Sequence, residues 1–454
     1  MDPAALKEQL PRFADELRKS PTATTYERAN AAYVAKDYNE AERLALAGAD
    51  EAQRASPPKN ADAIRAFELA GWSAEKRIDY ADALTRFQDA EKLTDRTRDP
   101  LEWARVKFGI GMVHYDRGQY GEAERLFREV LQERERMLGV AHADSLETRS
   151  ELESALYYQG KYAEDEEQIR VLLALKEKAL GLEHPETLKA RNNLGALLFA
   201  EGKYAEAETE LRAVLQLKEK VLGPEHQDTI GTRNNLASTL AAEGKYAESE
   251  AQFRALVMLA EKTFGPEHPK TLATRGNLAE LLDNEGKYAE AETEEREVLH
   301  LDDKVLGPEH PDTLDTRANL AGTLLHEGRY VEAETEARQV VRLDEKVRGV
   351  EHPSTLEVRN SLADAIAAQG RYSEAETEYR SVLTLREKVL GVEHPDTLQT
   401  CFNLATCLRD EGKASEAKAL AQRAADGARK SLGPEHPDTK KYEQLRDELF
   451  AKQD

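Results

Sequence analysis

The sequence predicts an all-α solenoid made of stacked antiparallel helix pairs. Two rows of glycine recur at a fixed step of 42 residues, and the segments between them carry apolar residues at helical spacing. A helix pair of this kind cannot bury its apolar face alone, so successive copies must stack side by side. The first row is Gly139, Gly181, Gly223, Gly265, Gly307, Gly349, Gly391 and Gly433, and the second is Gly118, Gly160, Gly202, Gly244, Gly286, Gly328, Gly370 and Gly412.

Residues 183–222 illustrate one copy. Gly181 ends the preceding helix, because glycine accepts the left-handed cap conformation. Pro185 suits the first turn of the next helix, where its missing N–H is not needed. Gly202 ends this helix, and a second helix runs from there to Gly223. Each helix should contain about 16–18 residues and measure about 25 Å.

The repeated motif resembles a tetratricopeptide repeat: Asn-Leu-Gly or Asn-Leu-Ala, then Gly-Lys-Tyr-Ala-Glu-Ala-Glu. The 42-residue step and the His-Pro-Asp-Thr loop narrow the resemblance to the long repeats of kinesin light chains and their bacterial relatives, one kind of which accompanies bacterial tubulins. The resemblance is strong over residues 139–439 and implies a right-handed superhelix. Kinesin light chains carry a long coiled coil before their repeats. Only about twenty residues precede the first repeat here, without sustained heptads, so motor binding is not expected.

Weaker copies extend the repeats toward the N-terminus, which gives ten predicted helix pairs. We expect an N-terminal helical segment at residues 1–21 and three divergent pairs at residues 22–138. Seven regular copies should follow at residues 139–432, and a helix at residues 433–454 should cap the last apolar face.

Composition narrows the function classes. The net charge of −23 disfavours nucleic acid and anionic lipid as partners. Two cysteines make no disulfide framework, and the sequence lacks a signal peptide and any apolar run long enough to span a membrane, so we expect a cytoplasmic protein. No nucleotide-binding or catalytic motif occurs, which predicts a non-catalytic protein without a cofactor. One histidine per repeat is too widely spaced for a metal site and predicts loop and N-cap residues instead.

A row of arginines lies on the predicted apolar stripe and calls for carboxylate partners. Its members are Arg149, Arg191, Arg233, Arg275, Arg317 and Arg359. A glutamate row, which includes Glu208, matches it copy by copy. Both rows fail together in the copy that carries Cys401 and Lys418, so we expect Arg191 to pair with Glu208 and the other copies to do the same. A ladder for phosphate or carboxylate groups is the alternative.

An asparagine precedes the leucine in the first helix of most copies. The row comprises Asn193, Asn235, Asn277, Asn319 and Asn403. The resemblance implies that this helix lines the concave surface and that the asparagine binds the backbone of a bound peptide. A side-chain amide can do this because it both donates and accepts. A loop or inter-repeat hydrogen bond is the alternative.

Other positions expected on the concave surface change from copy to copy. Apolar and aromatic residues occupy them early in the chain, and polar residues occupy them later. The early set is Phe108, Met112, Tyr115, Tyr157, Tyr158 and Phe199. We expect these side chains to be exposed and to anchor a partner. The alternative is that they are covered by an N-terminal segment of the same chain.

These features predict a scaffold that binds a protein or peptide through a concave groove. A sharper hypothesis is a kinesin-light-chain-like protein on bacterial tubulin filaments, where many weak contacts would add up. The alternatives are a peptide-sensing module that controls a separate enzyme and a self-assembling structural protein.

Overall fold

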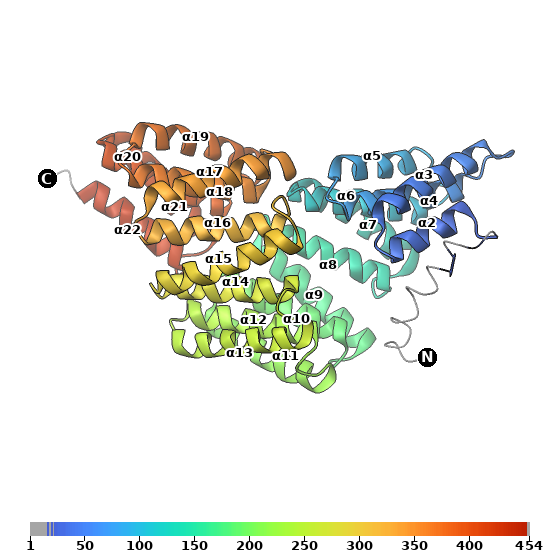
Figure 1. The fold of residues 1–454 in the computed structure, drawn as a ribbon, viewed down its shortest axis with the longest axis horizontal. Helices are drawn as coiled ribbons and strands as arrows, with labels where there is room; N and C mark the ends of the chain where they lie inside the picture. Colours follow the sequence, from blue (N-terminus) through green and yellow to red (C-terminus); the bar gives the residue numbers. More distant parts are fainter. Residues whose placement is uncertain (1–15, 18–19, 21, 452–454) are drawn as a thin grey trace. The chain divides into compact units, whose positions relative to one another are not determined.

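The computed structural model of the chain describes residues 16–17, 20 and 22–451, which form helices and no strand (Figure 1). The all-α prediction is therefore confirmed. The chain forms two compact units: unit 1, Met1–Ala155, and unit 2, Leu156–Asp454. The division falls within helix α8 (Ala143–Tyr157). The helix predicted within residues 1–21 lies almost wholly outside the described residues, and the four predicted segment boundaries stay a prediction.

Within each unit, helices that follow one another in sequence pack against each other, as expected of a solenoid. Before α8, unit 1 contains α2 (Thr25–Val34), α3 (Tyr38–Arg54), α4 (Asn60–Glu75), α5 (Tyr80–Glu91), α6 (Pro100–Asp116) and α7 (Tyr120–Leu138). Unit 2 contains α9 (Tyr162–Leu180), α10 (Pro185–Ala200), α11 (Tyr204–Val221), α12 (Gln227–Ala242), α13 (Tyr246–Phe264), α14 (Pro269–Asn284), α15 (Tyr288–Val305), α16 (Pro311–His326), α17 (Tyr330–Val347), α18 (Pro353–Ala368), α19 (Tyr372–Val389), α20 (Pro395–Glu411), α21 (Ala414–Ser431) and α22 (Pro437–Ala451).

The histidine row caps the first helix of each regular pair, as predicted. In α10, Nδ1 of His184 accepts a hydrogen bond from the backbone N–H of Glu186 at 3.2 Å, which satisfies one of the free donors at the helix start. His226 and His310 cap α12 and α16 in the same way. Glycine ends the helices with a positive φ, for example +94° at Gly181.

Small residues let the two helices of a pair approach closely. Ala207 of α11 is fully buried. A Cβ placed on Gly195 of α10 would lie 2.6 Å from Cδ2 of Leu211, so the glycine makes room for this leucine side chain. Leucines fill the remaining space, and Leu188 and Leu197 are fully buried. The apolar stripe read from the sequence is therefore the seam between helices.

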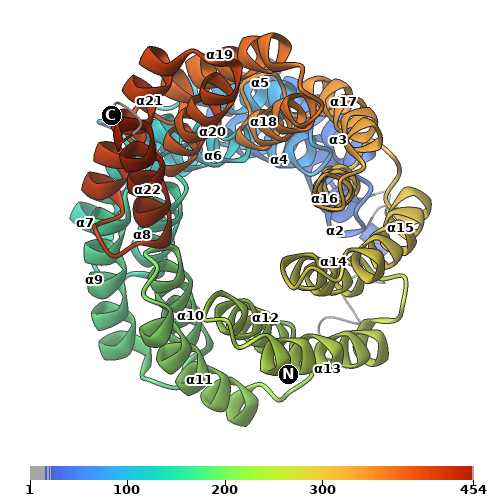
Figure 2. The same cartoon turned by 90° about the vertical axis from the view of Figure 1, so that its left-hand side faces the viewer.

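Unit 2 turns through one full superhelical round, so that its last repeats meet its first (Figure 2). Nε2 of His394 lies 3.2 Å from the carbonyl oxygen of Tyr158, 236 residues earlier in the chain. Pro395 stacks on Gly160, and His436 with Pro437 stacks on Gly202. We call this set the closure contact; its residues are Tyr158, Gly160, Gly202, His394, Pro395, His436 and Pro437. The side chains of His394 and His436 are 7% and 9% exposed there, whereas the capping side chain of His226 is 38% exposed.

The predicted pairing of Arg191 with Glu208 is wrong. Nε of Arg191 lies 2.6 Å from Glu210, two residues further along α11. Glu208 binds Arg212, one turn away, and Lys245 of the next repeat, each at 2.8 Å. Because Glu208 points along the outer face of α11, it links neighbouring repeats and cannot reach the seam that holds Arg191.

The other arginines of the row also pair with carboxylates outside the predicted glutamate row, in two alternating ways. Three use a residue 14 positions earlier, and three use one 19 positions later. The first pairs are Arg149–Glu135, Arg233–Glu219 and Arg317–Asp303, and the second are Arg191–Glu210, Arg275–Glu294 and Arg359–Glu378. In the copy with Cys401, the earlier carboxylate Glu387 pairs instead with Arg423 at 2.5 Å. The joint loss at Cys401 and Lys418 therefore did not mark a broken pair.

Candidate functional site

The first helix of each pair in unit 2 lies on the inside of the superhelical turn. Figure 2 shows α10, α12, α14, α16, α18 and α20 around the inside, with α11, α13, α15, α17, α19 and α21 outside. Three hollows follow one another along this inner surface, each formed by side chains from neighbouring repeats. We call this surface the groove of unit 2.

The first hollow has a mixed lining of apolar and polar side chains, has a volume of about 290 Å³ and lies between α10, α12, α13 and α14. Aromatic and aliphatic side chains form its walls, and two amides and a carboxylate lie at one side. Its lining residues are Phe199, Ser238, Ala241, Ala242, Tyr246, Phe253, Asn277, Glu280, Leu281 and Asn284. A concavity that combines apolar walls with polar groups is a usual form of a ligand or peptide subsite.

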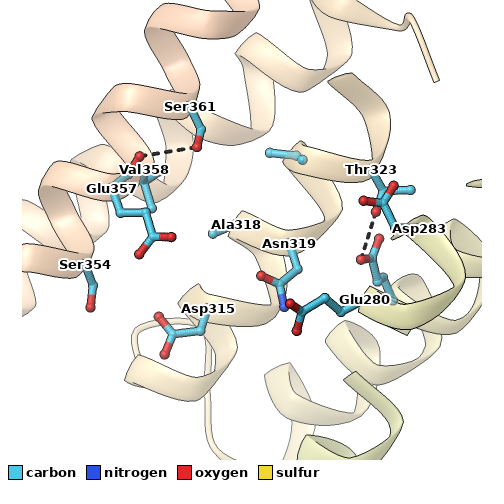
Figure 3. Close-up of a pocket in the computed structure, with 13 residues that line it drawn as sticks. Glu280, Asp283, Asp315, Ala318, Asn319, Thr323, Ser354, Glu357, Val358 and Ser361 are labelled. Carbon is cyan, nitrogen blue, oxygen red and sulfur yellow. Dashed lines mark hydrogen bonds between the residues drawn. The ribbon is translucent and has the colours of Figure 1, made fainter. Parts of the chain in front are cut away.

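The second hollow, of about 370 Å³, is acidic (Figure 3). Five carboxylates from α14, α15, α16 and α18 surround it, and we call it the acidic pocket: Glu280, Asp283, Glu295, Asp315 and Glu357. Figure 3 shows small side chains such as Ala318 between the carboxylates, and a Cβ on Gly322 would meet open space. Small residues on α16 thus make the room that the carboxylates enclose.

Two of these carboxylates have cationic partners. Asp283 is held by Nδ1 of His326 at 2.7 Å, and Asp315 by Arg348 at 2.7 Å. The hydrogen bond that His326 donates to Asp283 raises the pKa of His326. Glu280, Glu295 and Glu357 form no ion pair within the part of the chain that the structure describes. The pocket therefore carries excess negative charge.

The wall of the groove changes the acidity of these carboxylates. The Glu280 and Glu357 side chains are exposed to solvent, yet the protein around them displaces enough water to raise the pKa of both, and Asp283 adds to this effect at Glu280. Glu295 is only 2% exposed, and burial raises its pKa to about 8. Of these three groups, Glu295 is the one that holds a proton at neutral pH and can lose it when a cation approaches.

The third hollow, of about 270 Å³, lies between α18, α19 and α20 and is internally satisfied. Its central carboxylate, Asp364, accepts hydrogen bonds from the hydroxyl of Tyr379 and from Nδ2 of Asn403, the latter at 3.1 Å. Burial raises the pKa of Asp364 to about 6. Phe402 and Cys407 complete the wall. This hollow offers shape and an apolar wall rather than free charge.

Sequence profiles of the tetratricopeptide repeat match residues 186–254, 228–304, 312–388 and 354–430, and a second profile of this repeat matches residues 109–144 and 147–186. The chain belongs to the tetratricopeptide repeat family. The first profile alone spans more than half of the chain, and its matches cover most of the groove-lining repeats. A search of curated proteins finds no match.

Several solved tetratricopeptide structures are similar to this chain. A Podosopora anserina protein with nearly identical TPR-like repeats of a kinesin light chain is 29% identical over 46% of this chain and 98% of its own, with a TM-score of 0.39. BtubC (BKLC) from P. vanneervenii is 18% identical over 52% of this chain and 92% of its own, also with a TM-score of 0.39. The predicted tetratricopeptide repeat is confirmed by the two sequence profiles.

A Rap protein complexed with competence and sporulation factor matches over a longer stretch. It covers 86% of this chain and 99% of its own, with 13% identity and a TM-score of 0.54. At this identity the match shows a shared tetratricopeptide fold and nothing finer. The arrangement of helix pairs, rather than the groove residues, is what the two chains have in common.

The asparagine row of this tetratricopeptide protein lies on the inner helices, and several members bridge repeats. Nδ2 of Asn277 donates to Oδ1 of Asn234 at 2.7 Å, and Asn235 donates to Asn192 at 3.4 Å. Asn277, Asn319 and Asn403 also line the three hollows. Asn193 is half-buried. Inter-repeat bonding therefore occurs, and peptide binding by the row stays a prediction.

The aromatic set is divided between the two units. In unit 1, Phe108 is only 8% exposed and packs on Phe127, so the expectation that it is exposed is wrong. Its side chain faces the core because α6 is apolar on nearly all sides. Met112 and Tyr115 are half-buried.

The remaining members of the set lie in unit 2. Tyr158 is 47% exposed, while Tyr157 is half-buried and packs against Tyr158 and Tyr162. Phe199 is half-buried and lines the first hollow. Of the six side chains, only Phe199 lines one of the three hollows, and the partner-binding role of the set stays a prediction.

Sequence reasoning missed the acidic pocket, although one signal was available. The position of Glu295 is apolar in most other copies, where it holds Phe127, Ile169, Leu211, Phe253, Ala337, Tyr379 and Ala421. A carboxylate at a position that is apolar in the other copies departs from the repeat pattern, and such departures are typical of functional residues. Reading each row for its exceptions would have found this residue.

No helix in the described ranges has the length and apolarity to cross a bilayer. Likewise, no group of three or more His, Cys, Asp or Glu side chains within residues 22–451 has the arrangement needed to hold a metal ion.

Proposed function

We propose that this protein is a non-catalytic scaffold that holds a segment of a protein partner in the groove of unit 2. The observation that carries the proposal is the row of three hollows on the inner helices. Their lining changes along the groove, from aromatic at Phe199 and Phe253 in the first hollow to acidic at Asp315 and Glu357 in the second. A groove whose lining changes along its length can distinguish one partner sequence from another.

A site-specific photocrosslinker tests this proposal in cells that produce the protein. The crosslinker replaces Ser238 in the first hollow and, as the matched control, Thr209 on the outer helix α11. We expect a discrete protein adduct from position 238 and none of that mass from position 209. Equal adducts from both positions, or none from position 238, would count against the groove as the binding surface.

The finer form of the proposal is a cytoplasmic protein that associates with bacterial tubulin filaments. Its support is the resemblance of the 42-residue repeats to those of bacterial kinesin light chains. Co-sedimentation with assembled bacterial tubulin tests it. The bound fraction should fall when Asn277 and Asn319, which line adjacent hollows, are both replaced by alanine. Absence of co-sedimentation would leave the scaffold proposal in place and remove the filament.

A peptide-sensing regulator is the second candidate. The fold-level match to the Rap protein favours it, since that structure contains competence and sporulation factor. Limited proteolysis with and without the partner distinguishes the two candidates. A regulator should change its cleavage pattern in repeats far from the groove, whereas a passive scaffold should be protected only along α10–α20.

A further inference from the structure

The acidic pocket lacks a cation of its own. Its thirteen lining residues include five carboxylates but no lysine, arginine or histidine. His326 and Arg348 bind Asp283 and Asp315 from outside the lining, and no cation among the described residues forms an ion pair with the three glutamates. Figure 3 shows Glu280 and Asp283 on one side and Glu357 on the opposite side of the same hollow. The open space between them is therefore strongly favourable for a positive group.

Two oxygen atoms in this pocket are buried without a hydrogen-bond partner among the described residues. Oε1 of Glu295 accepts from the Thr323 hydroxyl at 3.0 Å, but Oε2 accepts nothing. Oδ2 of Asp283 binds His326, but Oδ1 accepts nothing. A buried polar atom left unpaired costs free energy, so native proteins rarely retain one without a reason.

The repeat shows that the chain has an alternative at this position. Phe253 fills the place of Glu295 one copy earlier, and Ala337 fills it one copy later. Either would remove the unsatisfied oxygen. The carboxylate is thus an exception in a core row, placed where the wall opens into the groove.

We propose that the acidic pocket receives the guanidinium group of an arginine side chain carried by the bound partner segment. The planar guanidinium presents several N–H donors in a fixed fork, which suits two free acceptors on neighbouring side chains better than a single ammonium does. Glu280 and Glu357 at the open side would attract the cation and lead it inward. This inference rests on the proposed function and names the chemistry of the partner.

Proton release provides a signature of this binding mode. The groups that face Glu295 are Asp283 on α14, Glu292 and Arg296 on α15, and Thr323 on α16. Burial has the largest effect on the pKa of Glu295, so Glu295 binds a proton at neutral pH. That proton lies on Oε2, because Oε1 accepts the hydrogen bond from Thr323. An entering guanidinium stabilises the carboxylate and expels that proton. Binding should therefore release about one proton at pH 7 and become tighter as the pH rises toward 8.

Isothermal titration of the full chain with N-acetylated, C-amidated hexa-arginine tests the proposal. Titrations in two buffers of different ionisation enthalpy count the protons released. We expect wild type to release about one proton, and Glu295→Gln to release none and to bind at least about tenfold more weakly. Glu206→Gln makes the same carboxyl-to-amide change on the exposed outer face of α11 and should change neither quantity. The neutral isostere hexa-citrulline should not bind.

Each other outcome decides the matter. Wild-type affinity and proton release in Glu295→Gln would overturn the assignment, and so would equal losses in Glu206→Gln, which would indicate general attraction to an acidic protein. Spermidine binding with the same dependence on Glu295, without hexa-arginine binding, would assign the pocket to a free polyamine instead. Asp283→Asn, which can still accept from His326, provides a second variant should Glu295→Gln fold poorly. The photocrosslinking at position 238 does not involve this pocket, so it tests the scaffold proposal separately.

Discussion

The closure contact and the acidic pocket both bury a titratable side chain in unit 2, but the two side chains behave in opposite ways. At the closure contact, burial lowers the pKa of His394 and keeps it neutral. In the acidic pocket, burial raises the pKa of Glu295 to about 8 and keeps that side chain neutral as well. The closure contact should therefore weaken in acid, and the pocket should weaken the fold in base.

The two neutral side chains differ in how many of their polar atoms have a hydrogen-bond partner. Nδ1 of His394 accepts from the backbone N–H of Asp396 at 3.1 Å, so its proton lies on Nε2 and is donated to Tyr158. Both ring nitrogens are used. Glu295 uses one oxygen and leaves the other unpaired. A structural contact is complete within the chain, whereas a binding site is completed by its partner, and this contrast is what the experiments below test.

The largest expected effect is the pH dependence of stability that Glu295 causes. Its folded pKa, about 8, lies above the unfolded value near 4.5, so between these pH values the folded state holds a proton that the unfolded state has lost. Stability should fall as the pH rises through this window, by roughly 5 kcal/mol in total. Glu295→Gln should remove that slope.

Urea unfolding of wild type and Glu295→Gln at several pH values measures how the stability of each depends on pH. The amide that replaces Oε2 adds an offset that does not vary with pH, so only the slope is interpreted. Glu206→Gln is the control for loss of charge. Parallel wild-type and Glu295→Gln profiles would mean that Glu295 is ionised in the fold and already has a partner.

The next largest effect is expected from alanine substitutions at two matched glycines, one in the closure contact and one outside it. Gly160 and Gly244 occupy the same position in the repeat, with φ of +65° and +78°. A Cβ on Gly160 would lie 2.5 Å from Cδ of Pro395, whereas one on Gly244 would meet nothing within 4 Å. Alanine at either position should cost about 1–2 kcal/mol for the backbone, and Gly160→Ala should cost about 1–3 kcal/mol more for displacing Pro395. Equal losses in denaturant unfolding would show that the ends of unit 2 do not pack together in solution.

The sequence predicted the repeat far better than the superhelix. Periodic features such as the Gly181 cap, the His184 N-cap and the buried Ala207 follow from local rules, because each acts within one helix pair. Closure depends on a small rotation per repeat summed over more than five copies, which no local pattern specifies. The contact between His394 and Tyr158 therefore had no sequence signal.

The site was predicted only in outline. The asparagine positions Asn277 and Asn319 do line the groove, because helix periodicity fixes which face points inward. The ion pairs were assigned wrongly because several carboxylates lie within reach of each arginine, and a match in copy number cannot choose among them. Arg191 selects Glu210 over Glu208 by side-chain direction, which only the packed helices determine.

A smaller effect is expected from His394 itself. His394→Ala removes both an N-cap bond and the hydrogen bond to Tyr158, whereas His226→Ala removes only the N-cap bond to Asp228. Each should lose about 1 kcal/mol for the cap, and His394→Ala should lose about 1 kcal/mol more for the closure bond. Because the folded pKa of His394 is lowered, this extra loss should be full above about pH 6.5 and shrink below it, where the unfolded chain takes up the proton. A constant difference from pH 5 to pH 8 would contradict the assignment.

The smallest expected effect is the loss of stability when a carboxylate in unit 2 loses the arginine that pairs with it. Arg275 is 12% exposed and binds Glu294 and, at 2.7 Å, Glu297, on the helix that also carries Glu295. Arg275→Ala should cost about 1 kcal/mol, at the low end for a broken buried pair, because Glu294 remains 22% exposed and can recover water. Glu294→Gln in the same protein should restore part of that loss, and a double-mutant cycle measures the coupling. A loss of about 3 kcal/mol or more, on the order expected for a fully buried orphaned charge, would show that the α14–α15 seam cannot tolerate an unpaired carboxylate. Glu295, which lies one residue away without a cation, would then have to stay protonated until a bound cation replaces its proton.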